Sequence, residues 1–181
     1  MCTFHRDQSF IDSTTVHMVR SELLRTGESY RVAVIAYCFM PDHLHALIEG
    51  IAADSDLLRC TKMFRQRSGH SYRALKRRAL WQQGYFDRFL RAEEAALDVA
   101  SYVVGNPIRA GLCADLGAYP YLGSSCFSIE ELIARPNRLR SRAGADTRVR
   151  PRPLHDRGTD RIARPKGSAL HLHIQAVAAV A

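Results

Sequence analysis

Two histidines stand one residue apart in the stretch from Arg31 to Gly50, where two apolar runs flank a Met40-Pro41-Asp42 break. Runs rich in Val, Ile, Tyr and Phe on either side of such a break predict a pair of adjacent strands. Because successive side chains of a strand point to opposite faces, His43 and His45 share one face. Two neighbouring imidazoles can hold one metal ion, although two solvated or hydrogen-bonded histidines are the simpler interpretation of this short motif alone.

A tyrosine and an asparagine occur one helical turn apart further along the chain. The segment from Ala92 to Asn106 is predicted to be a helix, because two glutamates near its start suit the helix dipole and Pro107 follows its end. On such a helix, Tyr102 and Asn106 lie side by side on one face.

These residue types together indicate metal-assisted attack on a phosphodiester. A tyrosine hydroxyl, with a reference pKa of about 10, is a poor nucleophile at pH 7 but leaves well enough to make its attack reversible. A divalent ion held by His43, His45 and the side-chain oxygen of Asn106 would polarise the phosphate and neutralise charge on the leaving 3′-oxygen. Mixed nitrogen and oxygen ligation suits Mn²⁺, and Mg²⁺ is acceptable where phosphate and water fill the remaining positions.

A run of cations without any acid lies between Asp56 and Asp87. Such a cluster can follow a phosphate backbone, and a solvated helix face is the equally weighted alternative. Its members are Arg59, Lys62, Arg65, Arg67, Arg73, Lys76, Arg77 and Arg78.

Two amphipathic helices are predicted on either side of the strand pair. Asp12 or Ser13 caps the first, which ends near Gly27, and Asp54 or Ser55 caps the second. The residues of the second helix expected to face the core are Leu57, Leu58, Thr61, Phe64 and Leu75.

The order of these elements predicts the fold class. Cys2 to Phe4 read as the end of a strand, and the aromatic-rich segment from Leu80 to Leu90 reads as an extended segment that completes the sheet. The resulting order of strand, helix, strand, strand, helix and strand is an α+β arrangement. It is a ferredoxin-like βαββαβ antiparallel sheet with helices on one face, plus an additional C-terminal helix that carries the tyrosine.

The charge distribution divides the chain of 181 residues into one domain over residues 1–133 and a basic, disordered tail over residues 134–181. The tail holds eleven lysines and arginines against three aspartates, an excess equal to the net charge of the whole chain, +8. The rest of the chain is therefore neutral, despite the cation run that it contains.

Several protein classes are disfavoured by the sequence. Its apolar runs are much shorter than the ~20 residues of a membrane-spanning helix, and the first residues contain no apolar signal core, so we expect a cytoplasmic protein without membrane contact. The five cysteines are odd in number and never spaced as Cys-x-x-Cys, which argues against a disulfide framework and a zinc knuckle.

Four segments resemble a known family. PDHLHALIEG, LWQQGYFDRFLRAEEA, SYVVGNPIRAGL and YPYLGSS occur in the order seen in the REP-associated tyrosine transposases, a branch of the single-tyrosine HUH transposases. The resemblance spans roughly Thr3 to Ser125. It implies a nuclease domain that binds single-stranded DNA folded as a REP-like hairpin, cleaves it by tyrosine attack, and leaves a 5′-phosphotyrosine and a free 3′-hydroxyl.

The resemblance also assigns roles to residues. His43 and His45 match the HUH pair, Tyr102 matches the nucleophile, and Asn106 matches the polar residue that completes the metal site. Trp81, Gln82 and Tyr85 match a structural or DNA-contacting motif. Arg109 lies in the NP-x-R-A-G-L turn, where a phosphate contact is expected. We expect a nucleoid-associated protein that is a monomer or a homodimer.

The sequence departs from the family at both ends. It begins inside the family's first strand, and the tail matches no part of the family, which leaves a nonspecific DNA tether or a relic of a shifted reading frame as hypotheses. Two rival functions also remain open. One is a nucleic-acid-binding regulator that keeps the fold without turnover, and the other is a metal hydrolase in which the histidine pair activates water.

Overall fold

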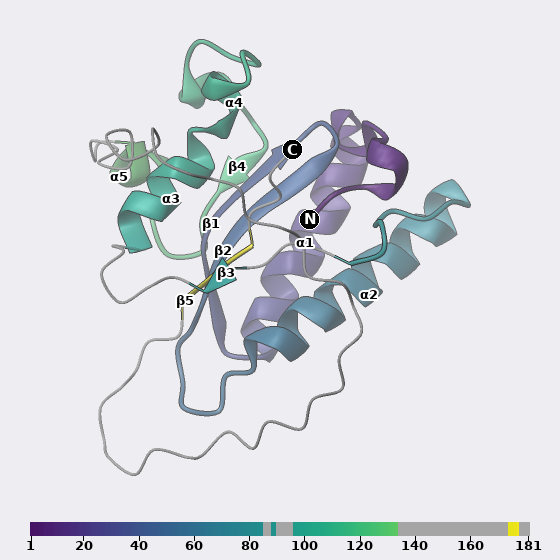
Figure 1. The fold of residues 1–181 in the computed structure, drawn as a ribbon, viewed down its shortest axis with the longest axis horizontal. Coiled ribbons are helices and arrows are strands. Elements are labelled where there is room, and N and C mark those ends of the chain that lie inside the picture. Colours follow the sequence, from purple (N-terminus) through teal and green to yellow (C-terminus); the bar gives the residue numbers. More distant parts are fainter. Residues whose placement is uncertain (85–87, 90–95, 134–173, 178–181) are drawn as a thin grey trace.

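The computed structural model describes residues 1–84, 88–89, 96–133 and 174–177. Helices pack on both faces of an antiparallel sheet (Figure 1). Within the described ranges, no helix is long and apolar enough to cross a membrane. In chain order the elements are α1 (Ser13–Ser29), β1 (Val32–Met40), β2 (His43–Gly50), α2 (Leu57–Lys76), β3 (Arg88–Phe89), α3 (Ala96–Val104), α4 (Asn106–Arg109), β4 (Leu122–Gly123), α5 (Ile129–Ile133) and β5 (Ile174–Val177), with 3₁₀ turns at Phe4–Arg6, Ser9–Ile11 and Leu116–Ala118.

The antiparallel pair of β1 and β2 is the centre of the sheet. The two strands run from Val32 opposite Gly50 to Met40 opposite His43, so that Pro41 and Asp42 alone connect them. Most of their residues are buried, as expected for strands that are covered on both faces. The predicted strand pair and its break are therefore confirmed.

The complete sheet has the strand order β3-β5-β2-β1-β4. The predicted first strand is reduced to two isolated bridges, in which Cys2 pairs with His43 and Thr3 pairs with Trp81. Strand β5 comes from the segment that the sequence assigned to the tail, and it pairs with both β2 and β3. The predicted disorder between residues 134 and 173 lies outside the described residues.

Carboxylates cap both long helices. Asp12 accepts from the Thr14 backbone N–H at the start of α1, as predicted. Helix α2 is capped by Asp56, which accepts from the Arg59 N–H, so the predicted cap at Asp54 or Ser55 was wrong. The hydroxyl of Ser55 is used elsewhere, because it donates to the Arg31 carbonyl at 2.6 Å.

The helices form two layers with the sheet between them (Figure 1). Helices α1 and α2 pack on one face, and α3 and α5 pack on the other, each layer with its own apolar cluster. The predicted α+β class is confirmed: α1 and α2 cover one face as in a ferredoxin-like fold, and the additional helix α3 covers the opposite face. Leu58 and Leu75 are 56% and 52% exposed, so their predicted core positions were wrong; the buried stripe of α2 ends at Tyr72.

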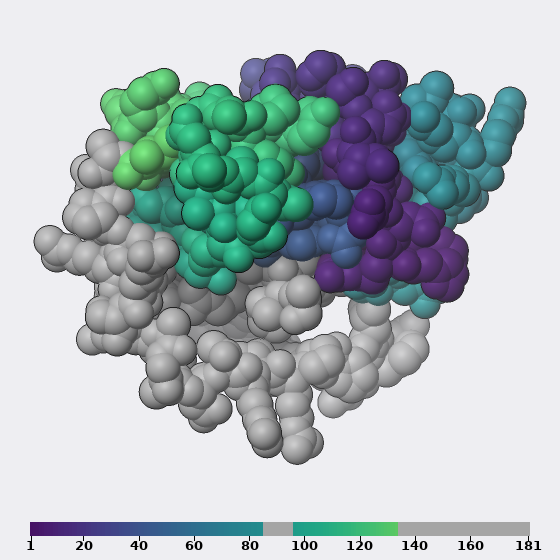
Figure 2. Space-filling model, turned by 90° about the horizontal axis from the view of Figure 1, so that it is seen from above, coloured from purple at the N-terminus to yellow at the C-terminus, as the bar shows by residue number. Residues whose placement is uncertain are grey.

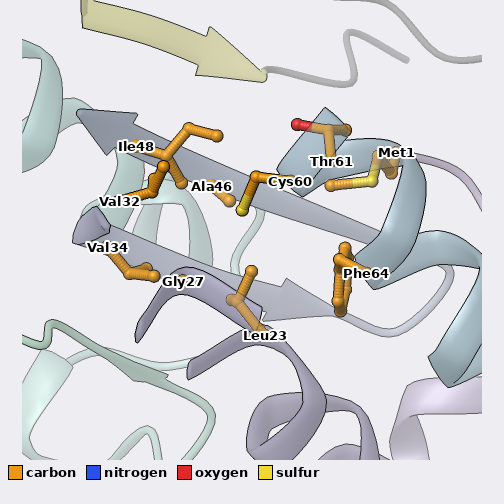
Figure 3. Close-up of a pocket in the computed structure, with 10 residues that line it drawn as sticks. All are labelled: Met1, Leu23, Gly27, Val32, Val34, Ala46, Ile48, Cys60, Thr61 and Phe64. Atoms are coloured by element: carbon orange, nitrogen blue, oxygen red, sulfur yellow. The ribbon is translucent and has the colours of Figure 1, made fainter. Parts of the chain in front are cut away.

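A small apolar pocket lies between the β1–β2 pair and helices α1 and α2, and Leu23, Gly27 and Phe64 are among the residues that line it (Figure 3). Gly27 lies at a close approach of α1 to β1, because a Cβ added there would lie 2.7 Å from the Val32 carbonyl oxygen. A side chain at this position therefore requires the backbone of α1 or β1 to move.

We expect Gly27→Ala to lower the free energy of unfolding by about 1–3 kcal/mol, the usual cost of overpacking a core. Gly69→Ala in α2 is the matched control, because its nearest neighbour is the Trp81 ring at an ordinary 3.5 Å. The control should raise the free energy of unfolding by up to ~1 kcal/mol through helix propensity. Urea denaturation measures the free energy of unfolding of both variants. An equal change in the two would contradict the close approach at Gly27.

Candidate nucleic-acid cleavage site

The two histidines of β2 point to the face of the sheet that α3 covers. Leu44, Ala46 and Ile48 belong to the apolar cluster under α1 and α2, whereas Leu47 belongs to the cluster under α3. Because strand side chains alternate, His43 and His45 share the face of Leu47. Their Nε2 atoms lie 2.9 Å apart. The predicted pairing of the two rings is thus present in the structure.

Burial keeps both imidazoles neutral near pH 7. Desolvation lowers the pKa of His45 to about 2, and the cation Arg109, together with any charge on His43 or the amino terminus, acts in the same direction. Desolvation also lowers the pKa of His43, although the carboxylate of Asp42 opposes this shift. A neutral imidazole is the form that binds a metal ion.

Asp42 contacts His43 Nδ1, the ring nitrogen that does not face His45. Its Oδ1 lies 2.6 Å from His43 Nδ1, and the second carboxylate oxygen pairs with Arg6. From the sequence, Asp42 was expected only to belong to the break between the two strands. A carboxylate directly before a candidate ligand histidine is nevertheless a recognisable signal, because histidine ligands commonly donate their second N–H to a carboxylate.

The donor set of the histidine pair fits a divalent ion. Two nitrogens that each bind an ion at ~2.0–2.1 Å, about 90° apart, are separated by roughly 2.9 Å, which is the observed Nε2–Nε2 separation. Among the described residues, no group of three or more His, Cys, Asp or Glu side chains could hold a metal ion. The pair therefore suits an ion whose other positions are filled by amide, phosphate or water oxygens.

Tyr102 lies on α3 and reaches the surface. Its neighbours Val99 and Val103 are buried against the sheet, whereas Tyr102 itself is 40% exposed. It is the one exposed tyrosine in the part of the chain that the structure describes. In Figure 2, the end of the strand pair (blue) lies between the segment of α3 and α4 (green) and the N-terminal segment (purple).

Arg109 stacks on the Tyr102 ring and acts electrostatically on His45. Its guanidinium carbon lies 3.9 Å from the centre of the Tyr102 ring, a cation–π contact, and it also donates a hydrogen bond to the Tyr102 carbonyl. The positive charge of Arg109 lowers the pKa of His45. A Cβ at Gly105 would come 2.9 Å from Arg109 Nη1, so the glycine leaves room for this side chain. Arg109 therefore contacts Tyr102 directly and lies near enough to His45 to act on its charge.

Asn106 begins α4 rather than continuing α3, which ends at Val104. Its Nδ2 donates to the carbonyl of Val103 at 2.9 Å and, more weakly, to that of Tyr102 at 3.4 Å. These bonds fold the amide back over the last turn of α3, next to Tyr102 as predicted. The role of its oxygen as a metal ligand stays a prediction.

Two other tyrosines, Tyr72 and Tyr119, form hydrogen bonds within the fold. Tyr72 is buried, and its hydroxyl contacts Ser9 and Arg78. The hydroxyl of Tyr119 donates to the Phe39 carbonyl, and burial raises its pKa. Tyr121 is half-buried, and Tyr85 lies outside the described residues.

Trp81 has a structural role in the fold. Its indole N–H donates to Ser68 Oγ at 2.9 Å, and its ring packs between Phe10 and Phe64. Of the two roles that the sequence left open, the contacts of Trp81 support the structural one.

The cation run is separated from the histidine pair by the sheet. Arg59 to Lys76 belong to α2, which covers the opposite face. Four members also have intramolecular partners. Arg59 lies over the Tyr30 ring, Arg65 donates to the Gln82 carbonyl, Lys76 pairs with Asp12, and Arg78 pairs with Asp7. Arg67 is half-buried in a cleft between α1 and α2. The exposed members are Arg59, Lys62, Arg73, Lys76, Arg77 and Arg78.

Comparisons with known proteins agree with this fold. The chain's fold is similar to a solved structure of a REP-associated tyrosine transposase bound to a REP hairpin, with a TM-score of 0.56 and 18% sequence identity over 67% of this chain and 72% of that one. No curated protein matches the chain. A family model described as "Transposase IS200 like" matches residues 1–106, a range that contains His43, His45, Tyr102 and Asn106. Since this match covers more than half of the 181 residues, the chain belongs to the IS200-like transposase family.

Proposed function

We propose that the chain is a metal-dependent single-stranded DNA endonuclease and strand transferase that cleaves at DNA hairpins through a covalent 5′-phosphotyrosine. The observation that carries this proposal is the position of Arg109, which stacks on the ring of Tyr102 and acts electrostatically on His45. This position supports the proposal that a surface tyrosine, a cation and two neutral imidazoles act in one site.

Tyr102 is the proposed nucleophile. Its hydroxyl oxygen attacks the phosphorus and gives up its proton, a new O–P bond forms, and the bond from phosphorus to the 3′-oxygen breaks. The 3′-oxygen takes a proton and leaves as a free hydroxyl. The reverse reaction, with a 3′-hydroxyl as the nucleophile, rejoins strands and releases the tyrosine.

His43 and His45 would hold a Mg²⁺ or Mn²⁺ ion through their Nε2 atoms, with the side-chain oxygen of Asn106 as the third protein ligand. When bound, the ion supplies charge neutralisation for the phosphate and the leaving oxygen. Arg109 adds a permanent positive charge beside the tyrosine, where it can contact the same phosphate.

Exposed cations on α2 would bind the DNA at a second place. Arg59, Lys62 and Arg73 on α2, and Arg77 directly after it, have solvent-exposed side chains, and the helix contains no acid. They lie across the sheet from Tyr102, so they would bind the backbone of a hairpin stem rather than the scissile phosphate. The similar solved structure, in which the transposase is bound to a REP hairpin, supports a hairpin as the partner.

A labelled single-stranded hairpin substrate tests the proposal. Incubation with Mn²⁺ should give a protein–DNA adduct that survives denaturing electrophoresis, and EDTA should prevent it. Hairpin binding without any adduct would favour a regulator that keeps the fold without turnover. Cleavage without an adduct would favour a hydrolase, and an adduct that persists in EDTA would contradict the metal requirement.

A further inference from the structure

The carboxylate of Asp42 lies between a histidine and an arginine. One oxygen is 2.6 Å from His43 Nδ1 and the other is 2.8 Å from Arg6 Nε. Arg6 in turn places its Nη1 2.9 Å from Cys2 Sγ. Cys2, Arg6, Asp42 and His43 thus form a continuous chain of contacts that ends at His45 Nε2.

The contact with Asp42 decides which nitrogen of His43 carries the proton. An ionised carboxylate can only accept hydrogen bonds, so His43 Nδ1 must be the donor. The lone pair of the neutral ring is then on Nε2, the atom that faces His45. His45 differs, because its Nδ1 is buried and has no hydrogen-bond partner.

The N-terminal segment holds Asp42 at both its backbone and its side chain. The carbonyl oxygen of Asp42 accepts from the N–H of Thr3 at 3.0 Å and from its hydroxyl at 2.8 Å. The N–H of Phe10 donates to the carbonyl of Pro41 at 3.0 Å. The turn between β1 and β2 is therefore fixed by residues 3–10, and Arg6 fixes the carboxylate.

We propose that Asp42, held by Arg6, is a positioning residue that fixes the His43 proton on Nδ1 and so presents His43 Nε2 to a divalent ion. This inference rests on the proposed function for the ion itself. It does not need a direct contact between Asp42 and the metal or the DNA. His43 is then the preset ligand of the pair, whereas His45 Nε2 donates to His43 Nε2 in the metal-free protein and must give up that proton before it can bind an ion.

Two measurements on the full chain test the role of Asp42. Nitrogen-15 NMR of the metal-free protein identifies the protonated nitrogen of His43, with the His43→Ala spectrum as the assignment control. Titration with Mn²⁺ alone, followed by electron paramagnetic resonance, gives the affinity for the ion. Neither measurement depends on cleavage.

We expect Asp42→Ala to release the proton from Nδ1 of His43 and to weaken Mn²⁺ binding by about 10–100-fold, the usual effect of removing the partner of a ligand histidine. Asp42→Asn keeps an acceptor oxygen, so His43 should retain its Nδ1 proton. The affinity of this variant for Mn²⁺ should fall by less than about tenfold. Asp7→Ala is the matched control, because Asp7 lies on the same N-terminal segment as Arg6 and also forms an ion pair with an arginine, Arg78. It should leave both measurements unchanged.

An Asp42→Ala protein that keeps the proton on Nδ1 and binds Mn²⁺ like the wild type would overturn the proposal. An equal loss of Mn²⁺ affinity in Asp7→Ala would also overturn it, since that result would indicate a general effect on the N-terminal segment. A wild-type protein that binds no Mn²⁺ would contradict the metal dependence of the proposed function. The NMR measurement would then decide alone whether Asp42 fixes the His43 proton.

Discussion

Tyr102→Phe should abolish formation of the protein–DNA adduct while leaving folding and hairpin binding nearly unchanged. The substitution removes the nucleophilic oxygen, and it keeps the ring on which Arg109 stacks at 3.9 Å. Because the side chain is 40% exposed, its hydroxyl contributes little to the packing of α3. Denaturing electrophoresis measures the adduct, and a gel-shift titration measures binding.

The control for this variant is Tyr121→Phe, which changes a half-buried tyrosine whose ring packs edge-on against Tyr119. It should form the adduct at the wild-type rate. An active Tyr102→Phe protein, or loss of the adduct in the control, would show that another tyrosine attacks the DNA.

His43→Ala and His45→Ala should each lower the rate of cleavage by at least about a hundredfold. A metal ion contributes several kcal/mol to stabilising charge in the transition state, and each 1.36 kcal/mol corresponds to a factor of ten in rate. Asn106→Ala should cost less, because water can replace an amide oxygen. Single-turnover cleavage assays with saturating hairpin measure these losses.

The affinity of each variant for the hairpin shows whether it has lost catalysis or DNA binding. The exposed cations of α2 lie across the sheet from the histidines, so both histidine variants should bind the hairpin about as well as the wild type. His70→Ala, at an exposed position of α2, is the control that should retain full cleavage. Loss of binding together with cleavage would place His43 and His45 in the DNA-binding surface rather than in a metal site.

Patterns that depend on neighbouring residues could be read from the sequence. Alternation along the strand placed His43 and His45 on one face, and their Nε2 atoms do meet at 2.9 Å. Helical spacing placed Asn106 next to Tyr102, and its amide donates to the carbonyls of the last turn of α3. The first contact is set by the backbone of one strand, and the second by the short connection from α3 to α4.

Contacts between distant segments could not be read in the same way. The cation run is continuous in sequence, yet Arg65 is held by the Gln82 carbonyl, and the sheet separates α2 from the histidines. The role of Asp42 depends on Arg6, which reaches it from the start of the chain. The stacking of Arg109 on Tyr102 depends on the turn between α3 and α4. Tertiary packing decides which residues such side chains contact.

Mass spectrometry of the trapped wild-type adduct tests the central claim most directly. After proteolysis, the nucleotide should be attached to Tyr102, on the peptide that contains SYVVGNP. The attached DNA should begin with its 5′-phosphate on the tyrosine, and the released fragment should end in a 3′-hydroxyl. A nucleotide found on Tyr85, Tyr72 or any other residue would contradict the assignment of Tyr102 as the nucleophile.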